Sequence, residues 1–144
     1  MGETLKSPAQ PDAPSAPPVV PEVSFFFDFS SPFAYLAATQ IESVAARNGA
    51  RVRFRPFLLG GLFKAIGTPD VPLFSMPQAK RDHATADMNR WAEHYGIPLR
   101  FPTRFPMNTV KALRMVLQLD EPARPPLVHA LFDAFWIDDR DLYD

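Results

Sequence analysis

FFFDFSSPFAY, residues 25–35, is the stretch that decides the fold of this chain. Its first half is apolar and rich in strand formers, and the chain then passes through Ser-Ser-Pro into residues that suit a helix. Ser31 is expected to be the N-cap of that helix and Pro32 its first residue, because proline's fixed φ suits this position. The pattern predicts a hydroxyl at the positive end of a helix, beside the carboxyl edge of a strand, where a thiolate or another anion could be held.

The composition of the 144-residue chain suits one domain and excludes several classes of function. Its formal net charge of −1 lacks the basic excess that is usual in nucleic-acid binders and membrane-surface proteins. No apolar stretch approaches the roughly 20 residues that span a bilayer. The chain has no cysteine, which excludes a structural disulfide, a thiolate metal site and dithiol redox chemistry by the chain itself. We therefore expect a cytoplasmic protein with no nucleic-acid, membrane or metal partner.

Residues 1–22 differ in composition from the rest of the chain. Proline and alanine dominate, aromatic residues are missing, and no strand or helix period is present. The segment predicts a disordered, partly polyproline-II tail. A proline-rich recognition ligand is the alternative interpretation. Val19 and Val20 are too few to form the apolar region of a signal peptide.

Residues 23–56 predict a β-α-β unit. A strand buried on both faces is expected over residues 23–29, a helix closed by Gly49 over residues 32–48, and a second strand over residues 51–55. The two strands should be parallel, with a right-handed crossover between them. The predicted apolar stripe of the helix consists of Phe33, Leu36, Ala37, Ile41 and Val44.

The strictly alternating second strand places Arg51, Arg53 and Arg55 on one face. These side chains could form a patch that binds anions or nucleic acid. They could also form the solvated face of an edge strand, whose charges prevent unwanted pairing, and this second interpretation is favoured.

Residues 57–144 predict a loop followed by helices, with no third strand. Gly60-Gly61 marks a turn, and residues 62–66 could form one helical turn that presents Lys64. Residues 68–77 are expected to be a proline-containing loop. Three helices should follow, over residues 77–95, 109–119 and 126–138, with Asn108 capping the second. The three histidines are scattered, and no metal site, catalytic triad or phosphate-binding loop is indicated.

Four blocks of this sequence strongly resemble the 2-hydroxychromene-2-carboxylate isomerases. They are FDFSSPFAYL (27–36), FLLGGLFKAIG (57–67), RWAEHYGIPL (90–99), and the Phe-Pro and Met-Asn-Thr pieces of residues 101–109. Those enzymes belong with the kappa-class glutathione transferases. The resemblance covers about residues 23–137 and implies an α/β, thioredoxin-like (DsbA-like) fold with a helical insertion. It places the β-α-β half in residues 23–56 and the loop and insertion in residues 57–144.

The resemblance also implies where the reactive sulfur comes from. Disulfide oxidoreductases of this fold open the first helix with Cys-x-x-Cys, and here Ser31 and Ala34 stand in the cysteine places. A serine hydroxyl is far too weak an acid to imitate a low-pKa cysteine. The implied cofactor is therefore glutathione, and Ser31 is the catalytic and cofactor-binding residue that donates a hydrogen bond to its thiolate.

The implied reaction is reversible conjugate addition to a small aromatic substrate. The thiolate adds, a strained double bond becomes a rotatable single bond, and elimination returns glutathione with the isomer formed. By resemblance, Lys64 meets the substrate's carboxylate or phenolate, and Phe74, Ser75 and Phe105 lie where the isomerases contact substrate. The isomerases carry polar residues at the first two of these three positions and a tyrosine at the last, so this chain departs from the pattern there.

Family members continue into a Val-Pro segment with a cis-proline, two antiparallel strands and a closing helix, which complete the sheet and hold the backbone of glutathione. This chain ends at Asp144, near the end of the insertion. Val71-Pro72 is no substitute, because no strand signal follows it. The resemblance thus implies a partial domain that lacks the C-terminal strands, from a full-length protein that forms a homodimer.

Three functions remain open from the sequence. The leading hypothesis is glutathione-dependent isomerisation of 2-hydroxychromene-2-carboxylate-type intermediates of aromatic degradation. A kappa-like glutathione transferase or peroxidase, acting on other electrophiles, is the nearest enzyme alternative. An inactive binding or dimerisation remnant, with an exposed sheet edge, is the third.

Overall fold

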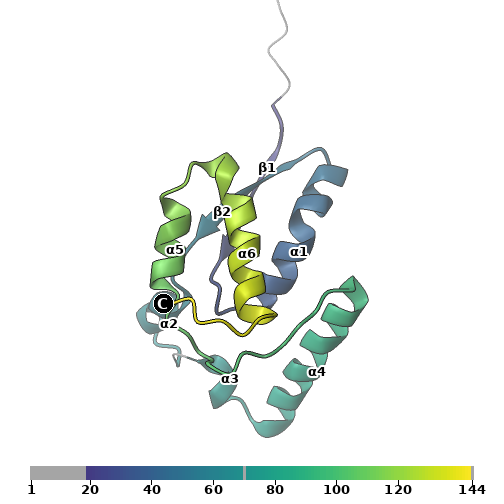
Figure 1. Ribbon diagram of the computed structural model, residues 1–144. Coiled ribbons are helices and arrows are strands. Elements are labelled where there is room, and N and C mark those ends of the chain that lie inside the picture. The colour runs from purple at the N-terminus through teal and green to yellow at the C-terminus, as the bar shows by residue number, and fades with distance from the viewer. Residues whose placement is uncertain (1–18, 70, 144) are drawn as a thin grey trace, which may run out of the picture.

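The computed structural model describes residues 19–69 and 71–143, and it places a two-stranded parallel sheet at the centre of the chain (Figure 1). β1 (Glu22–Phe27) pairs with β2 (Arg51–Pro56), and α1 (Pro32–Arg47) connects them. The predicted β-α-β unit with parallel strands is therefore confirmed. Of the tail predicted over residues 1–22, residues 1–18 lie outside the described residues, and Glu22 already belongs to β1.

α1 begins and ends as its sequence predicts. Ser31 is the N-cap, with an extended backbone, and its Oγ accepts a hydrogen bond of 3.2 Å from the amide of Ala34. Pro32 is the first helical residue. Gly49 follows the C-cap with a φ of +65°, a left-handed conformation that favours glycine.

The second half of the described chain is helical and contains no further strand, as predicted. Its elements are α2 (Leu59–Ala65), α3 (Pro72–Ser75), α4 (Gln78–Tyr95), α5 (Val110–Leu117), the 3₁₀ turn η1 (Glu121–Ala123) and α6 (Arg124–Trp136). Two expectations were wrong. Gly60-Gly61 lies inside α2 instead of forming a turn before it, and the loop expected over residues 68–77 contains α3, for which Pro72 supplies the first residue.

An aromatic core joins one face of the sheet to the helices. In Figure 1, α6 lies between α1 and α5, and all three cover the same face of the strands. The ring of Phe132 in α6 lies 5.8 Å from that of Phe27 and 4.9 Å from that of Phe29, both in tilted or edge-on geometry. The members of this aromatic core are Phe25, Phe27, Phe29, Tyr35, Phe54, Phe132, Phe135 and Trp136.

The opposite face of the sheet is open, so the prediction that β1 is buried on both faces was wrong. Phe26 points to this face and is 62% exposed, with its ring edge-on to Phe57. The continuous apolar run of β1 predicted that helices would cover both faces of the sheet. However, α1, α5 and α6 all pack on the side of Phe25 and Phe27, so the alternate position remains in solvent.

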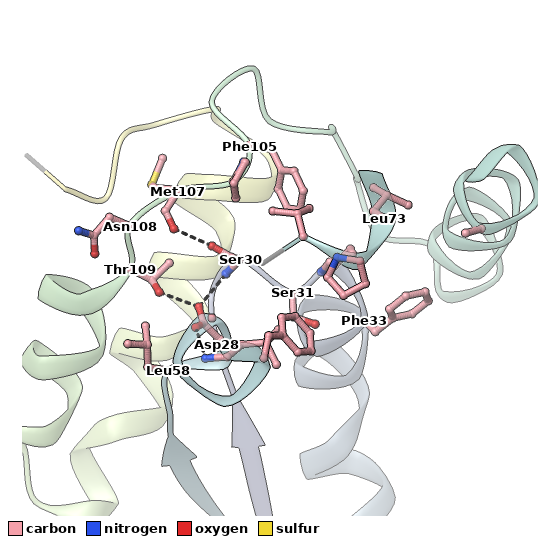
Figure 2. A pocket seen from close by; sticks show the side chains of 18 of the residues that line it. Asp28, Ser30, Ser31, Phe33, Leu58, Leu73, Phe105, Met107, Asn108 and Thr109 are labelled. Carbon is pink, nitrogen blue, oxygen red and sulfur yellow. Dashed lines mark hydrogen bonds between the residues drawn. The ribbon is translucent and has the colours of Figure 1, made fainter. Parts of the chain in front are cut away.

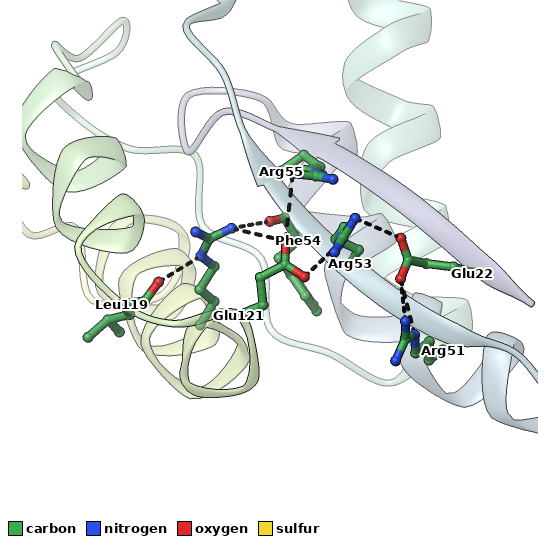
Figure 3. A network of polar contacts seen from close by, with 8 residues as sticks. Glu22, Arg51, Arg53, Phe54, Arg55, Leu119 and Glu121 are labelled. Carbon is green, nitrogen blue, oxygen red and sulfur yellow. Dashed lines mark hydrogen bonds and ion pairs between the residues drawn. The ribbon is translucent and has the colours of Figure 1, made fainter. Parts of the chain in front are cut away.

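The arginines of β2 share the open face and form ion pairs within the chain (Figure 3). Arg51 and Arg53 lie 3.0 and 3.2 Å from the carboxylate of Glu22, and Arg53 also bonds to Glu121 of η1. Desolvation raises the pKa of Glu121, but the hydrogen bond and charge of Arg53, with Arg55 and Arg124 nearby, outweigh it and hold that pKa below its usual range. These pairings favour a solvated, charged face over an anion-binding patch.

The buried side of α1 also differs from the predicted stripe. The structure buries Tyr35, Leu36, Ala38 and Ala45, whereas Phe33 and Val44 are exposed. The cause is Tyr35, whose ring stacks on Trp136 of α6 and whose hydroxyl donates a 2.6 Å hydrogen bond to the carbonyl of Pro98. Burial, with a smaller contribution from the charge of Asp133, raises the pKa of Tyr35 to about 12, so its phenol is neutral near neutral pH.

No helix among the described residues is both long and apolar enough to span a membrane.

We expect the aromatic core to dominate stability, and the open face to contribute little. Phe132→Ala should lower the free energy of unfolding by about 3–5 kcal/mol, because the ring is almost fully buried and leaves a cavity. Phe26→Ala, the matched control in β1, should cost less than about 1 kcal/mol. Urea unfolding followed by circular dichroism measures both values, and equal losses would contradict this assignment of the core.

Candidate functional site

A cavity of about 290 Å³ lies at the N-terminal end of α1 (Figure 2). Its walls come from the β1–α1 turn, from α2, from α3 and α4, and from the loop that leads into α5. Most lining side chains are apolar, among them Phe33, Leu58, Phe63, Leu73 and Phe105. The polar ones gather at the end of β1 and the start of α5; they are Asp28, Ser30, Ser31, Asn108 and Thr109. The site therefore pairs an apolar wall with a small polar floor.

Ser31 presents a hydroxyl to this cavity at the N-terminus of α1. Its oxygen accepts the amide hydrogen of Ala34, and within residues 19–69 and 71–143 its O–H donates to no protein acceptor. The first turn of a helix also has amide groups without helical partners, and here the amide of Phe33 is one of them. This O–H, an amide with no partner among the described residues and the positive end of the helix dipole together favour a bound anion.

Asp28 is the most connected polar group of the site, and the sequence alone assigned it no role. The residue is 2% exposed. Oδ1 accepts hydrogen bonds from the amide of Ser30 (3.0 Å) and the hydroxyl of Thr109 (2.7 Å), and Oδ2 accepts one from the amide of Leu59 (2.8 Å). A carboxylate at the end of an otherwise apolar strand was the available signal, since a buried charge needs partners.

The loop before α5 is hydrogen-bonded to the polar residues at the end of β1. The Ser30 hydroxyl donates to the carbonyl of Met107 at 3.0 Å, as Figure 2 shows. The expected cap at Asn108 was one residue off: Thr109 is the N-cap of α5, and Asn108 Oδ1 accepts from the amide of Val110 instead. Thr109 makes no capping bond with its side chain, because its hydroxyl bonds to Asp28.

The structure brings two of the five predicted site residues into the cavity. Ser31 and Phe105 line it. Phe74 of α3 does not line the cavity, but its ring packs perpendicular to that of Phe105, with the centroids 6.0 Å apart. Lys64 is in the last turn of α2 and does not line the cavity, although the preceding Phe63 does. Ser75 is exposed, and its hydroxyl donates to the carbonyl of Pro72.

The segment after α6 forms hydrogen bonds and ion pairs with the loop that carries Phe105. Asp139 accepts hydrogen bonds from the amide (2.8 Å) and the hydroxyl (2.9 Å) of Thr103, and it pairs with Arg100 at 3.3 Å. The amide and hydroxyl of Thr103, with the charges of Arg100 and Arg104, hold the pKa of Asp139 below its usual range. Further along, the amide of Leu142 lies 3.1 Å from the sulfur of Met107.

Metal binding has no support in the part of the chain that the structure describes. No group of three or more histidine or acidic side chains is placed there to hold an ion. The Ser31 hydroxyl and the first turn of α1 can offer hydrogen bonds to an anion beside an apolar wall.

Comparisons with known proteins fit this architecture. The family model described as DSBA-like thioredoxin domain matches residues 22–144. The 2-hydroxychromene-2-carboxylate isomerase of Pseudomonas putida is 32% identical over 114 residues, 79% of this chain and 55% of that protein. The isomerase of Sphingobium xenophagum is 29% identical, over 83% of this chain and 62% of its own length. Glutathione S-transferase kappa 1 of Caenorhabditis elegans is 29% identical, over 78% of this chain and 51% of that protein.

A solved structure also matches. It is that of 2-hydroxychromene-2-carboxylate isomerase, with a TM-score of 0.73 and 30% identity, covering 85% of this chain and 60% of that one. The chain thus spans between about half and three fifths of the length of these relatives.

The contact between Asp139 and Thr103 should make stability depend on acid pH. Because the folded-state pKa of Asp139 is lowered, its contribution is present above the ordinary aspartate pKa and is lost as the pH falls through the folded value. Asp139→Asn should therefore be less stable than the wild type at pH 6, with the difference shrinking below about pH 4. Asp138→Asn is the control, since this neighbouring carboxylate makes no hydrogen bond among the described residues. Urea unfolding at several pH values measures the difference, and a gap that persists at low pH would contradict it.

Proposed function

The chain belongs to the DSBA-like thioredoxin domain family, and on that premise we propose that it binds glutathione and uses its thiolate to isomerise a 2-hydroxychromene-2-carboxylate-type substrate. The observation that carries the proposal is the hydroxyl of Ser31, which faces an apolar cavity from a helix N-terminus with its hydrogen free to be donated. The isomerases among its relatives make this reaction the first to test.

The residues at the site fit a thiolate. When bound, glutathione supplies the sulfur nucleophile that this cysteine-free chain does not have. Ser31 offers an O–H donor, and the first turn of α1 offers an unpaired amide and the positive end of the dipole. The carboxylate of Asp28 would oppose a second anion. However, its two oxygens are already bonded to three donors, which draws its charge toward those groups.

Ser31 would act by favouring the ionised form of the bound thiol. A hydrogen bond made only to the thiolate lowers the thiol pKa, as the helix dipole does. The dipole contributes about 0.3–1 kcal/mol, and a hydrogen bond to a charged group about 1.5–3 kcal/mol. At about 1.4 kcal/mol per unit, these terms together would lower the thiol pKa by roughly one to three units.

The apolar wall suits an aromatic substrate. Phe33 and Phe105 flank the cavity, and Phe63 closes it from α2. At about 290 Å³ the cavity is at the small end of ligand sites, so the substrate and the peptide part of glutathione would not both fit inside it. We expect the ring to occupy the cavity and the substrate's anionic group to extend past α2, toward Lys64.

The residues of α3 are proposed as rim contacts. Phe74 packs against Phe105, so a change at either ring would alter the same edge of the cavity. Ser75 is one residue further along α3 and would meet only a substrate that protrudes from the cavity. These positions, with Lys64, would decide substrate preference more than reactivity.

A kappa-like transferase is the second candidate, because glutathione S-transferase kappa 1 of Caenorhabditis elegans is similar over 78% of this chain. The two activities differ in the fate of glutathione. An isomerase converts 2-hydroxychromene-2-carboxylate only when glutathione is present and consumes none. A transferase consumes one thiol for each chloro-dinitrobenzene converted.

One assay separates these functions. The protein contains no cysteine, so a thiol reagent measures free glutathione without background from the chain. Conversion of the chromene carboxylate at constant thiol concentration supports the isomerase. Thiol loss with chloro-dinitrobenzene and no conversion of the chromene supports the transferase. Turnover of neither, with glutathione still bound, supports the binding remnant.

Ser31→Ala should raise the pKa of the bound glutathione thiol by about one unit or more, because the donor to the thiolate is lost. Ser31→Asp should bind glutathione weakly while retaining the helix, since aspartate is an equally good N-cap but repels an anion. Ser43→Ala, on the exposed side of α1, is the control and should leave the thiol pKa unchanged. The thiolate's ultraviolet absorbance, titrated against pH, gives the value. An unaltered pKa in Ser31→Ala would overturn the assignment.

A further inference from the structure

We propose that Asp28 is the positioning residue of this site. Its buried carboxylate holds the β1–α1 turn, the first residue of α2 and the N-cap of α5 around the cavity, and so fixes Ser31 relative to the apolar wall. The inference rests on the proposed function for its catalytic consequence, but its structural part can be tested without glutathione. Neither the resemblance nor the comparisons assign Asp28 a role.

The contacts of Asp28 reach segments that are distant in the sequence. Leu59 is 31 residues away and Thr109 is 81 residues away, and both bond to the same carboxylate. Asp28 also bonds to its neighbours in the β1–α1 turn. The Ser30 amide donates to Oδ1 of Asp28, and the Ser31 amide donates to its backbone carbonyl at 3.0 Å. The carboxylate thus bonds to the turn before α1, to the first residue of α2 and to the N-cap of α5, and the backbone carbonyl of Asp28 holds the N-cap of α1.

Each of these contacts sets one part of the cavity. The bonds to Ser30 and Ser31 shape the turn that presents the Ser31 hydroxyl. The bond to Leu59 fixes the beginning of α2, whose Leu58, Leu59 and Phe63 form part of the wall. The bond to Thr109 fixes the start of α5 next to the loop that carries Phe105. Loss of the carboxylate would therefore shift the hydroxyl and the wall relative to each other.

The chemistry of these contacts requires a carboxylate. The three donors are shared between both oxygens, and in the described chain no lysine or arginine forms an ion pair with Asp28. Asparagine has the same shape but only one acceptor oxygen, so its NH₂ group would face one of the donors. Asp28→Asn must therefore lose the bond from the Leu59 amide or the bond from the Ser30 amide, whereas the Thr109 hydroxyl can still pair because it also accepts hydrogen bonds. Glutamate would be too long for the same three contacts.

Loss of positioning can be distinguished from loss of charge. Removing a negative charge near a thiolate lowers the thiol pKa, because the anion is then less opposed. Moving the Ser31 hydroxyl away from the thiolate raises it. Thr109→Val avoids this ambiguity, since it removes one donor to Asp28 and leaves the carboxylate charged. Thr109→Ser restores a hydroxyl at the same place and is the conservative rescue.

The test compares Thr109→Val, Thr109→Ser and Asp28→Asn in the full chain. Thr85→Val is the control, because the Thr85 hydroxyl donates to the carbonyl of Arg81 on the exposed side of α4, away from Asp28. Thr109→Val should raise the pKa of the bound thiol and lower kcat by about tenfold or more, with less change in KM, as expected for a misplaced reactive group. Thr109→Ser should restore most of the wild-type thiol pKa and most of the wild-type kcat. Thr85→Val should change neither.

Amide hydrogen exchange supplies the readout that needs no glutathione. In Asp28→Asn the amides of Ser30 or Leu59 should exchange at least several-fold faster, while amides in the middle of α4 keep their rates. If the wild type binds no glutathione, the proposed function fails and this exchange decides the role of Asp28. Unchanged exchange at both amides, or a thiol pKa in Thr109→Val equal to that of the wild type, would overturn the proposal.

Discussion

A buried carboxylate without a cationic partner must be compensated by hydrogen-bond donors, and this constraint organises the site. Asp28 directly follows β1 and is buried, and Ser30, Leu59 and Thr109 supply its donors. Because these donors lie at the starts of three helices, satisfying one charge brings three helix ends together. The cavity and the hydroxyl of Ser31 lie where these ends meet.

The aromatic core gives this arrangement a rigid base. Phe27 and Phe29, on either side of Asp28 in the sequence, both pack against Phe132 of α6. The indole N–H of Trp136 donates to the carbonyl of Phe29 at 2.8 Å, and this bond ties the β1–α1 turn to α6. The carboxylate therefore cannot shift without disturbing the buried aromatic core. A reactive group held on such a base is positioned more accurately than one on a free loop.

Local signals predicted much of the fold, and distant contacts account for what they missed. Proline at the first position of α1, the N-cap Ser31 and the alternation of β2 each act within a few residues, and the β-α-β unit followed from them. The exposure of Phe26 and the buried side of α1 depend on which faces the later helices cover. The role of Asp28 depends on partners 31 and 81 residues away, which no sequence period reveals. The roles of Ser31, Phe105, Lys64, Phe74 and Ser75 all remain predictions, and the structure places only Ser31 and Phe105 in the lining of the cavity.

A crystal structure of the chain grown with glutathione tests the central claim most directly. The account predicts the sulfur inside the cavity, within hydrogen-bonding distance of Ser31 Oγ, with the three contacts of Asp28 intact. A sulfur bound elsewhere, or a Ser31 hydroxyl that donates to a protein carbonyl while glutathione is present, would contradict it.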